Sequence, residues 1–264
     1  MPSGLPADLK THPQGYRVRK YRPELLNEWL ETAQQQELPG IAFVDHPASW
    51  EGIDFEVVDA LRAEWPALTI SVGIEVSNDP QTYPTTRPWV DANWKNLDLV
   101  VAKIAVLTEG LRIDRPTEES EWVTRQPDAL WHEYLYQLRL LLQSGSFDLL
   151  ADADALALHG VAYPQDRVAW VEELIDLLRS KQMALEISSA PRRKGFQGGF
   201  PASDLIEAAW AAEVPLVCGS GTHTFADVGD GFWELSTKWG PRLRACPVGY
   251  QSHQLILPKT GHDF

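Results

Sequence analysis

Cysteine is scarce in this chain: Cys218 and Cys246 are the only two among 264 residues. Two cysteines are too few to staple a chain of this length, so a disulfide-stabilised secreted scaffold is excluded and both are expected as reduced thiols of a cytoplasmic protein. No apolar stretch approaches the roughly 20 residues that a membrane span needs. The first residues also lack a basic segment followed by an apolar one, so no secretory signal is expected.

Positive charge is also in short supply. The chain carries 23 Lys and Arg against 37 Asp and Glu, a formal net charge of -14. Such a charge repels extended phosphate backbones at long range, so nucleic acid is not an expected partner. A small phosphorylated metabolite is still allowed, because a local basic cluster or a bound cation decides its binding. No Gly-, Ser- or Pro-rich linker divides the chain, which favours one domain over residues 1–264.

Short apolar runs alternate with segments of helical period. In the segment 23–33, for example, apolar residues recur at i, i+3, i+4 and i+7, with Pro23 suited to a first turn. Continuous apolar runs are typical of parallel strands buried on both faces. Strict alternation of about seven strand–helix units predicts an α/β fold with right-handed crossovers, a (βα)7 TIM-like barrel. The expected strands are 8–12, 41–46, 69–75, 98–106, 147–151, 183–188 and 214–219.

Histidine and acidic residues stand at the ends of these runs. His12 ends the first run, Asp45 and His46 end the second, Glu75 ends the third, and His223 follows the last. In a βα barrel, polar residues at the carboxyl ends of the strands meet on one rim, where the chemistry takes place. The pattern therefore predicts imidazoles and carboxylates gathered in one barrel mouth, as a metal site requires.

The order of these motifs resembles the PHP superfamily (polymerase and histidinol phosphatase), and within it the histidinol-phosphatase branch. The resemblance is carried by seven segments spread over nearly the whole chain: Asp8–His12 (DLKTH), Gly40–His46 (GIAFVDH), Val72–Glu75 (VGIE), Leu97–Ala105 (LDLVVAKIA), Ser144–Asp154 (SGSFDLLADAD), Leu185–Arg193 (LEISSAPRR) and Cys218–His223 (CGSGTH). The resemblance implies a distorted (βα)7 barrel that holds up to three divalent cations, commonly zinc, manganese or iron. It also implies hydrolysis of phosphate esters, in which cations activate water and neutralise the phosphoryl oxygens.

Several ligand positions of the family pattern are changed here. Lys10 stands at the first His of H-x-H, Ala105 at the His of the fourth strand, Asp152 at the His of G-H-x-D, and Gly221 at the Asp of S-D-x-H. The residues that match the pattern are His12, Asp45, His46, Glu75, Asp154 and His223. The resemblance implies that Lys10 and Gly221 remove ligands of one metal and Ala105 a ligand of a second. The resemblance also implies that the histidine ligands of a third metal are retained, as His46 and His223.

Two interpretations of the metal site stay open. In the first, one zinc, manganese or ferrous ion survives on His46, Asp152 and His223, with Glu75 alongside and His12 in the same ligand set. In the second, no metal binds and these residues are hydrogen-bonded remnants. Lys10 has alternatives of its own: it replaces a lost cation and contacts an anionic ligand as a point charge, or it forms a structural ion pair.

The cluster Arg192-Arg193-Lys194 follows a predicted strand and is the best phosphate-binding candidate in this acidic chain, because Arg offers bidentate geometry to phosphate. The alternative is a solvated surface loop. The sequence thus predicts a metal-dependent hydrolase of a small phosphate monoester, with Glu75 and Asp45 as catalytic carboxylates, Arg192, Arg193 and Lys10 as substrate contacts, and fewer metals than the family's three. The alternative function is a metal-poor pseudoenzyme that binds a phosphorylated metabolite or a protein partner without catalysis.

Overall fold

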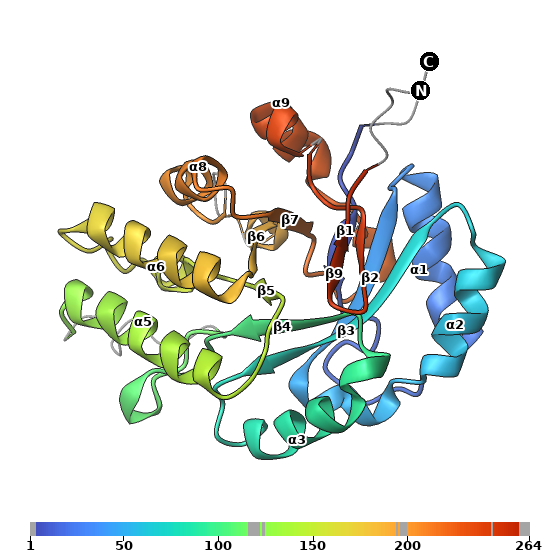
Figure 1. Cartoon of the computed structure of the whole chain (residues 1–264), viewed down its shortest axis with the longest axis horizontal. Helices are drawn as coiled ribbons and strands as arrows, with labels where there is room; N and C mark the ends of the chain where they lie inside the picture. The colour runs from blue at the N-terminus through green and yellow to red at the C-terminus, as the bar shows by residue number, and fades with distance from the viewer. Residues whose placement is uncertain are drawn as a thin grey trace.

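Seven parallel strands form the centre of the molecule in the order of the chain (Figure 1). The computed structural model describes residues 4–115, 122, 125–193, 195, 200–243 and 245–258. The strands of the sheet are β1 (Asp8–Thr11), β2 (Gly40–Asp45), β3 (Thr69–Ser77), β4 (Leu99–Lys103), β5 (Leu149–Leu150), β6 (Ala184–Ser188) and β7 (Leu216–Gly219). Each one lies within or overlaps a predicted apolar run, so the predicted strand order is confirmed.

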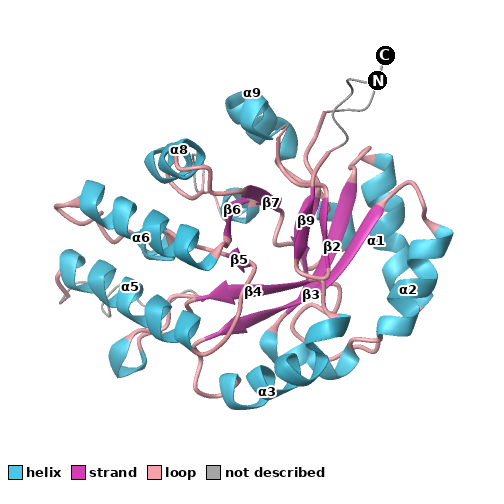
Figure 2. Ribbon diagram, viewed as in Figure 1, coloured by secondary structure: helices cyan, strands magenta, loops and turns pink. Residues whose placement is uncertain are grey.

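Helices connect the strands and cover the outer face of the sheet (Figure 2). The α-helices among the described residues are α1 (Pro23–Gln35), α2 (Phe55–Glu64), α3 (Tyr83–Asn93), α5 (Pro127–Gln143), α6 (Arg167–Lys181), α7 (Ala190–Arg193), α8 (Ser203–Ala211) and α9 (Phe232–Leu243). Short 3₁₀ turns lie at η1 (Pro47–Gly52), η2 (Trp94–Asn96), η3 (Thr108–Gly110), η4 (Ala155–His159) and η5 (Phe225–Asp227). Helix α1 illustrates why these segments form helices that pack on the sheet. It begins at Pro23, and residues of helical period form its buried face: Leu26, Trp29, Leu30 and Ala33.

The first and last strands approach each other and nearly close the sheet into a barrel. The backbone N–H of His12 donates to the carbonyl of Thr222 over 2.9 Å, and that of Gly221 donates to the carbonyl of Lys10 over 2.8 Å. The buried Asp8 carboxylate accepts from the backbone N–H groups of Ser220 and Gly229. These bonds hold the ends of β1 and β7 together, so the predicted (βα)7 TIM-like barrel is confirmed.

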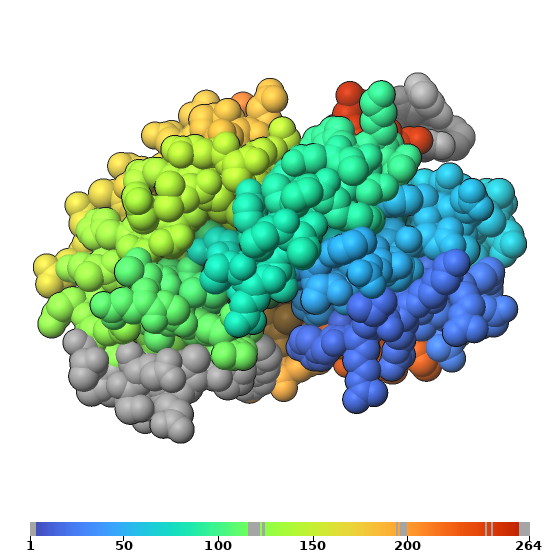
Figure 3. Space-filling view, turned by 90° about the horizontal axis from the view of Figure 1, so that it is seen from below, coloured from blue at the N-terminus to red at the C-terminus, as the bar shows by residue number. Residues whose placement is uncertain are grey.

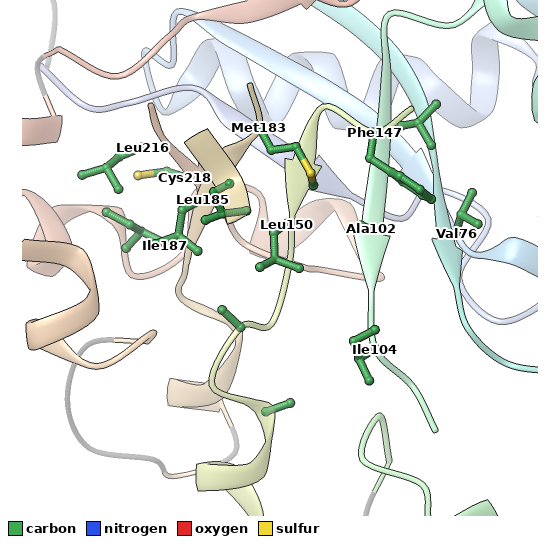
Figure 4. Packing of buried hydrophobic residues seen from close by; sticks show 14 of the residues in the cluster. Val76, Ala102, Ile104, Phe147, Leu150, Met183, Leu185, Ile187, Leu216 and Cys218 are labelled. Carbon is green, nitrogen blue, oxygen red and sulfur yellow. The ribbon is translucent and has the colours of Figure 1, made fainter. Parts of the chain in front are cut away.

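Strand alternation divides the core into two apolar layers. In β5, Leu149 belongs to the cluster inside the barrel, whereas Leu150 belongs to the cluster between the sheet and the helices. Figure 4 shows the outer layer, where Leu150, Leu185 and Ile187 lie among other labelled side chains of that cluster. Because neighbouring side chains point to opposite faces of a strand, every second residue lines the barrel interior.

A hairpin that the sequence did not predict covers the amino-terminal end of the barrel. Strands β8 (Gly249–Gln251) and β9 (Gln254–Ile256) pair antiparallel, and Tyr250 is buried in the interior cluster. The backbone N–H of Tyr250 donates to the hydroxyl of Ser71, which donates in turn to the Tyr250 carbonyl. The closed lower end leaves the carboxyl ends of the strands as the mouth in which a site can form.

The segments 78–96 and 109–128 are rich in Pro, Thr, Asp and Trp, a composition that predicts rim loops or short helices. The first contains α3, which in Figure 3 crosses the face of the molecule between the blue amino-terminal part and the yellow-green α5. Residues 116–121 and 123–124 of the second lie outside the described residues. Among the helices that the structure describes, none is both long and apolar enough to cross a membrane.

Candidate metal centre and ion-pair cluster

Three histidines from three parts of the chain meet at the barrel mouth. His12 follows β1, His46 follows β2 and His223 follows β7, and their potential ligand atoms all lie within 4.8 Å of one another. The Nε2 atoms of His46 and His223 are 2.8 Å apart. The rings of His12 and His46 stack with centroids 4.1 Å apart. The prediction that these imidazoles share one mouth is therefore confirmed by their geometry.

Contacts at Nδ1 fix the orientation of two of the rings. His12 Nδ1 faces the carbonyl of Val44, which can only accept, so Nδ1 carries the proton. His46 Nδ1 lies 3.6 Å from Glu75 Oε1. A histidine that ligates a metal commonly donates its other N–H to a carbonyl or carboxylate in this way, which fixes the tautomer and the ring orientation.

Two of the three imidazoles, those of His12 and His223, are poor bases in this environment. Burial, with the nearby His46 and Lys10 charges adding to it, lowers the pKa of His12 well below its usual value. Burial and the neighbouring His46 lower the pKa of His223 to about 4. Both rings are therefore neutral at neutral pH, the protonation state that metal ligation requires.

Tyr16 covers the histidines from the solvent side. Its ring stacks on His223 with centroids 4.3 Å apart and on His46 with centroids 5.1 Å apart. The Tyr16 side chain is otherwise open, at 82% exposure. The described loop between β1 and α1 thus places an exposed aromatic ring against the imidazole group.

Next to the histidines lies a buried group of five charges, which we call the ion-pair cluster: Lys10, Glu75, Lys103, Asp152 and Glu186. Lys10 Nζ lies 3.0 Å from Glu186, 3.6 Å from Asp152 and 3.9 Å from Glu75. Lys103 Nζ lies 2.8 Å from Asp152 and 3.7 Å from Glu75. Glu75 belongs to both groups, since its Oε1 faces His46 on one side and Lys103 on the other.

The charges of the cluster control its protonation. Burial alone raises the pKa of Glu75, but Lys103, His46 and Lys10 overcome it and hold that pKa below the usual range. The pKa of Asp152 is likewise lowered, because Lys10 and Lys103 outweigh its burial. Burial raises the pKa of Glu186 to about 7, with repulsion from Asp152 adding to it and attraction by Lys10 opposing it. Two ammonium groups thus fully compensate two carboxylates and leave the third, Glu186, close to titration at neutral pH.

Strand alternation explains why these charges converge. In three strands the charged residue comes two positions after a residue of the barrel interior: Glu75 after Gly73, Lys103 after Val101 and Glu186 after Ala184. In β1 the register shifts between Asp8 and Thr11, and Lys10 joins the same layer directly after the interior Leu9. The cluster is therefore the top layer of the barrel interior, resting on an apolar layer below.

Asp45, a predicted catalytic carboxylate, is buried, and its oxygens accept hydrogen bonds from the backbone and side chain of Gln14 and from the Tyr21 hydroxyl. Burial raises the pKa of Asp45 despite these bonds. Asp154, which matches the family motif, instead pairs with Arg167 and accepts from the Ala202 N–H. These two carboxylates thus hold loops around the mouth, whereas Glu75 and Asp152 lie in the ion-pair cluster.

The predicted phosphate-binding arginines differ in position. Arg193 donates to the backbone carbonyl of Ser220, on the segment that leads to His223, and lies 3.5 Å from Asp230. Arg192 pairs with the exposed Glu234 of α9 over 2.9 Å. Lys194 lies outside the described residues. Of the two described arginines, Arg193 is the one that borders the mouth.

Sequence reasoning missed the charge partners Lys103 and Glu186 and the covering Tyr16. For Lys103 a signal existed: an ionisable residue at the end of an apolar strand, in phase with the interior Val101. Glu186 similarly interrupts an apolar run. Tyr16 gave no signal, because a loop residue's position depends on how the loop folds over the barrel.

Comparison with known proteins provides an independent view of this arrangement. No family model matches the chain. A Deinococcus radiodurans protein named "Probable histidinol-phosphatase" is 25% identical over 218 residues, which cover 76% of this chain and 81% of that protein. The resemblance to the histidinol-phosphatase branch is confirmed.

Solved structures of histidinol phosphatases share the fold. A Listeria monocytogenes protein that carries this name provisionally matches 88% of this chain and 99% of its own length, with a TM-score of 0.70 and 16% identity. A Lactococcus lactis histidinol phosphate phosphatase, solved with zinc, L-histidinol and phosphate, matches 96% of this chain and 100% of its own length, with a TM-score of 0.63 and 18% identity. The likeness to the histidinol-phosphatase fold therefore extends over nearly the whole barrel.

Proposed function

We propose that this chain is a histidinol-phosphatase-like hydrolase of a small phosphate monoester, with one divalent metal held by His12, His46 and His223. The observation that carries the proposal is the convergence of three imidazoles within 4.8 Å at the barrel mouth. The relative named as a probable histidinol phosphatase and the related structure solved with zinc, L-histidinol and phosphate support it.

The three histidines fit a divalent metal by their chemistry. Neutral imidazoles suit zinc, manganese and ferrous iron, and three protein ligands leave a position open, as in catalytic sites. We leave Asp152 out of the proposed ligand set, because its carboxylate contacts Lys103 and Lys10. When bound, a metal supplies a nucleophilic water at neutral pH and neutralises charge on the phosphoryl oxygens.

The chain's own residues position the reactants around this site. Glu75 orients His46 through Nδ1, and Tyr16 limits the access of water to the imidazole face. Lys103, with 14% of its side chain exposed, places a positive charge beside the mouth. We assign the phosphate contact to Arg193 rather than Arg192, because Arg193 borders the segment of His223. Asp45 has the role of a positioning residue for the Gln14 loop.

The test measures metal content and phosphate release from histidinol phosphate by the same purified samples. The intact chain, purified without chelator, is expected to carry about one equivalent of a transition metal. His46→Ala and His223→Ala are expected to lose this metal and at least about 100-fold of the activity, since second-shell changes alone cost 10–100-fold. His132→Ala, on an exposed position of α5, is the matched control and should change neither quantity. Absence of metal and of phosphate release after adding manganese or zinc contradicts the proposal.

One observation favours the second candidate, a metal-poor protein that binds a phosphorylated metabolite without hydrolysing it. Lys10 and Lys103 already offset two of the three carboxylate charges of the mouth, so most of this negative charge is compensated without a metal. Calorimetry with histidinol phosphate separates the two functions. Saturable binding that persists in chelator, without phosphate release under any metal condition, supports the binder and excludes the hydrolase.

A further inference from the structure

The ion-pair cluster resembles a cation-binding site in which the ammonium groups of Lys10 and Lys103 occupy the place of bound cations. Two buried carboxylates, Glu75 and Glu186, and the partly buried Asp152 converge on two ammonium groups, which is an excess of one negative charge when all three carboxylates are ionised. Lys10 contacts all three carboxylates and Lys103 contacts two. Carboxylate oxygens from three strands around a common centre are also the ligands that a hard divalent cation prefers.

Two oxygens of the cluster lack hydrogen-bond partners. Glu75 Oε2 and Glu186 Oε1 are buried without a hydrogen bond, although a buried carboxylate oxygen is costly to leave unsatisfied. Glu75 Oε2 lies 3.9 Å from Lys10 Nζ, an electrostatic contact too long for a hydrogen bond. The two ammonium groups thus offset two of the three carboxylate charges and leave two carboxylate oxygens without a hydrogen bond.

A divalent metal does not fit beside these lysines. An ion bound by Glu75 and Asp152 would lie next to Lys103 Nζ, which is 2.8 Å from Asp152 and 3.7 Å from Glu75. Two positive charges at that separation in a buried site repel each other strongly. Without the Lys103 ammonium, the cluster would have three carboxylates against one ammonium, an excess of two negative charges, which one divalent cation balances.

We infer that Lys103, backed by the deeper Lys10, is a built-in cation that replaces a divalent metal on Glu75 and Asp152, and that its removal opens a metal site there. The carboxylate half of the mouth is thereby independent of metal supply. This inference rests on the proposed function only for the ion expected at the histidines. Its test measures whether an additional ion binds at Glu75 and Asp152.

The experiment compares manganese bound per chain after equilibrium dialysis in the intact protein, Lys103→Ala and Lys103→Arg. The intact protein is expected to bind one ion, Lys103→Ala one more, and Lys103→Arg, which keeps the positive charge, no more than the intact protein. Thermal melting gives a second readout: manganese should raise the melting temperature of Lys103→Ala more than that of the intact protein. Lys20→Ala removes an exposed lysine that pairs with Asp54 alone, and should gain no ion.

Equal manganese binding by folded Lys103→Ala and the intact protein overturns the inference, as does an extra ion in Lys103→Arg. A Lys103→Ala chain that unfolds in chelator is expected to refold with excess manganese, and failure to do so also overturns it. Adding His46→Ala to Lys103→Ala should remove the histidine ion and keep the new one. If the intact protein binds no manganese while Lys103→Ala binds one, the proposed function fails and the inference stands.

Discussion

The two halves of the barrel mouth reach charge balance in opposite ways. The histidine half presents three imidazoles, of which His12 and His223 are neutral at neutral pH, and in the proposed function it takes up an external cation. The ion-pair half contains its own cations, Lys10 and Lys103, paired with the buried Glu75 and Glu186 and the partly buried Asp152. Glu75 joins them, with one oxygen facing both His46 and Lys103.

This difference shows how a barrel can hold carboxylates in its interior by pairing them with lysines. A carboxylate in the barrel interior must be paired, because an isolated buried charge is very costly. A lysine on a neighbouring strand satisfies that need permanently, but it supplies no open coordination position. In the proposed function only the histidine half provides such a position, so the proposed chemistry is confined to it.

The largest effect on stability is expected from breaking the ion-pair half at its centre. Lys10→Met leaves three buried carboxylates with one ammonium, and removal of one partner from a buried ion pair costs about 3–5 kcal/mol. Urea unfolding followed by circular dichroism measures this loss. Lys20→Met, at an exposed pair with Asp54, is the control and should cost less than about 1 kcal/mol. Similar losses in both variants would show that the cluster contributes no special stability.

The link between the halves is tested by Glu75→Gln. The amide keeps the shape but loses the charge that faces His46 Nδ1 and Lys103. We expect metal affinity to fall about 10–100-fold, as for other carboxylate–histidine pairs behind a metal. Chelator competition measures the affinity. An unchanged affinity would mean that Glu75 serves the ion-pair half alone.

Glu186 is expected to make the unfolding free energy depend on pH near neutrality, because its pKa is raised whereas those of Glu75 and Asp152 are lowered. Because burial raises the pKa of Glu186 to about 7 from its ordinary value of 4.5, the folded protein binds this proton more tightly than the unfolded chain. The contribution is fully present below about pH 4.5 and is lost as the pH rises towards 7. Relative to the intact protein, Glu186→Gln should therefore show a smaller decline in unfolding free energy over this range. Parallel pH profiles of the two proteins would contradict the prediction.

The smallest effect is expected at Tyr16. Its exposed ring stacks on His46 and His223, and aromatic pairs of this kind contribute about 0.5–1.5 kcal/mol. Tyr16→Ala should speed the release of the histidine-bound metal by less than about tenfold, with little change in stability. Stopped-flow chelation measures this rate, and Tyr16→Phe should retain the slower release. A slower release in Tyr16→Ala would exclude a covering role.

Much of the fold could be predicted because apolar periodicity is local. The strand order and most helices follow from the alternation of apolar runs with periodic segments. The β8–β9 hairpin was missed, because its position depends on Tyr250 fitting into an interior that other strands create. At the site, the predicted grouping of His12, His46 and His223 matches the structure, because strand ends in a barrel meet on one rim.

The sequence by itself determined the barrel, its inward-facing phase and the residue types at each strand end. Tertiary structure alone decided which charge meets which. Lys10 and Lys103 are 93 positions apart in the numbering, and their contact with the same Asp152 arises from parallel packing and the register shift in β1. Periodicity specifies the face on which a side chain lies, whereas the pairing of charges depends on distances of a few ångströms between strands, which only the folded barrel sets.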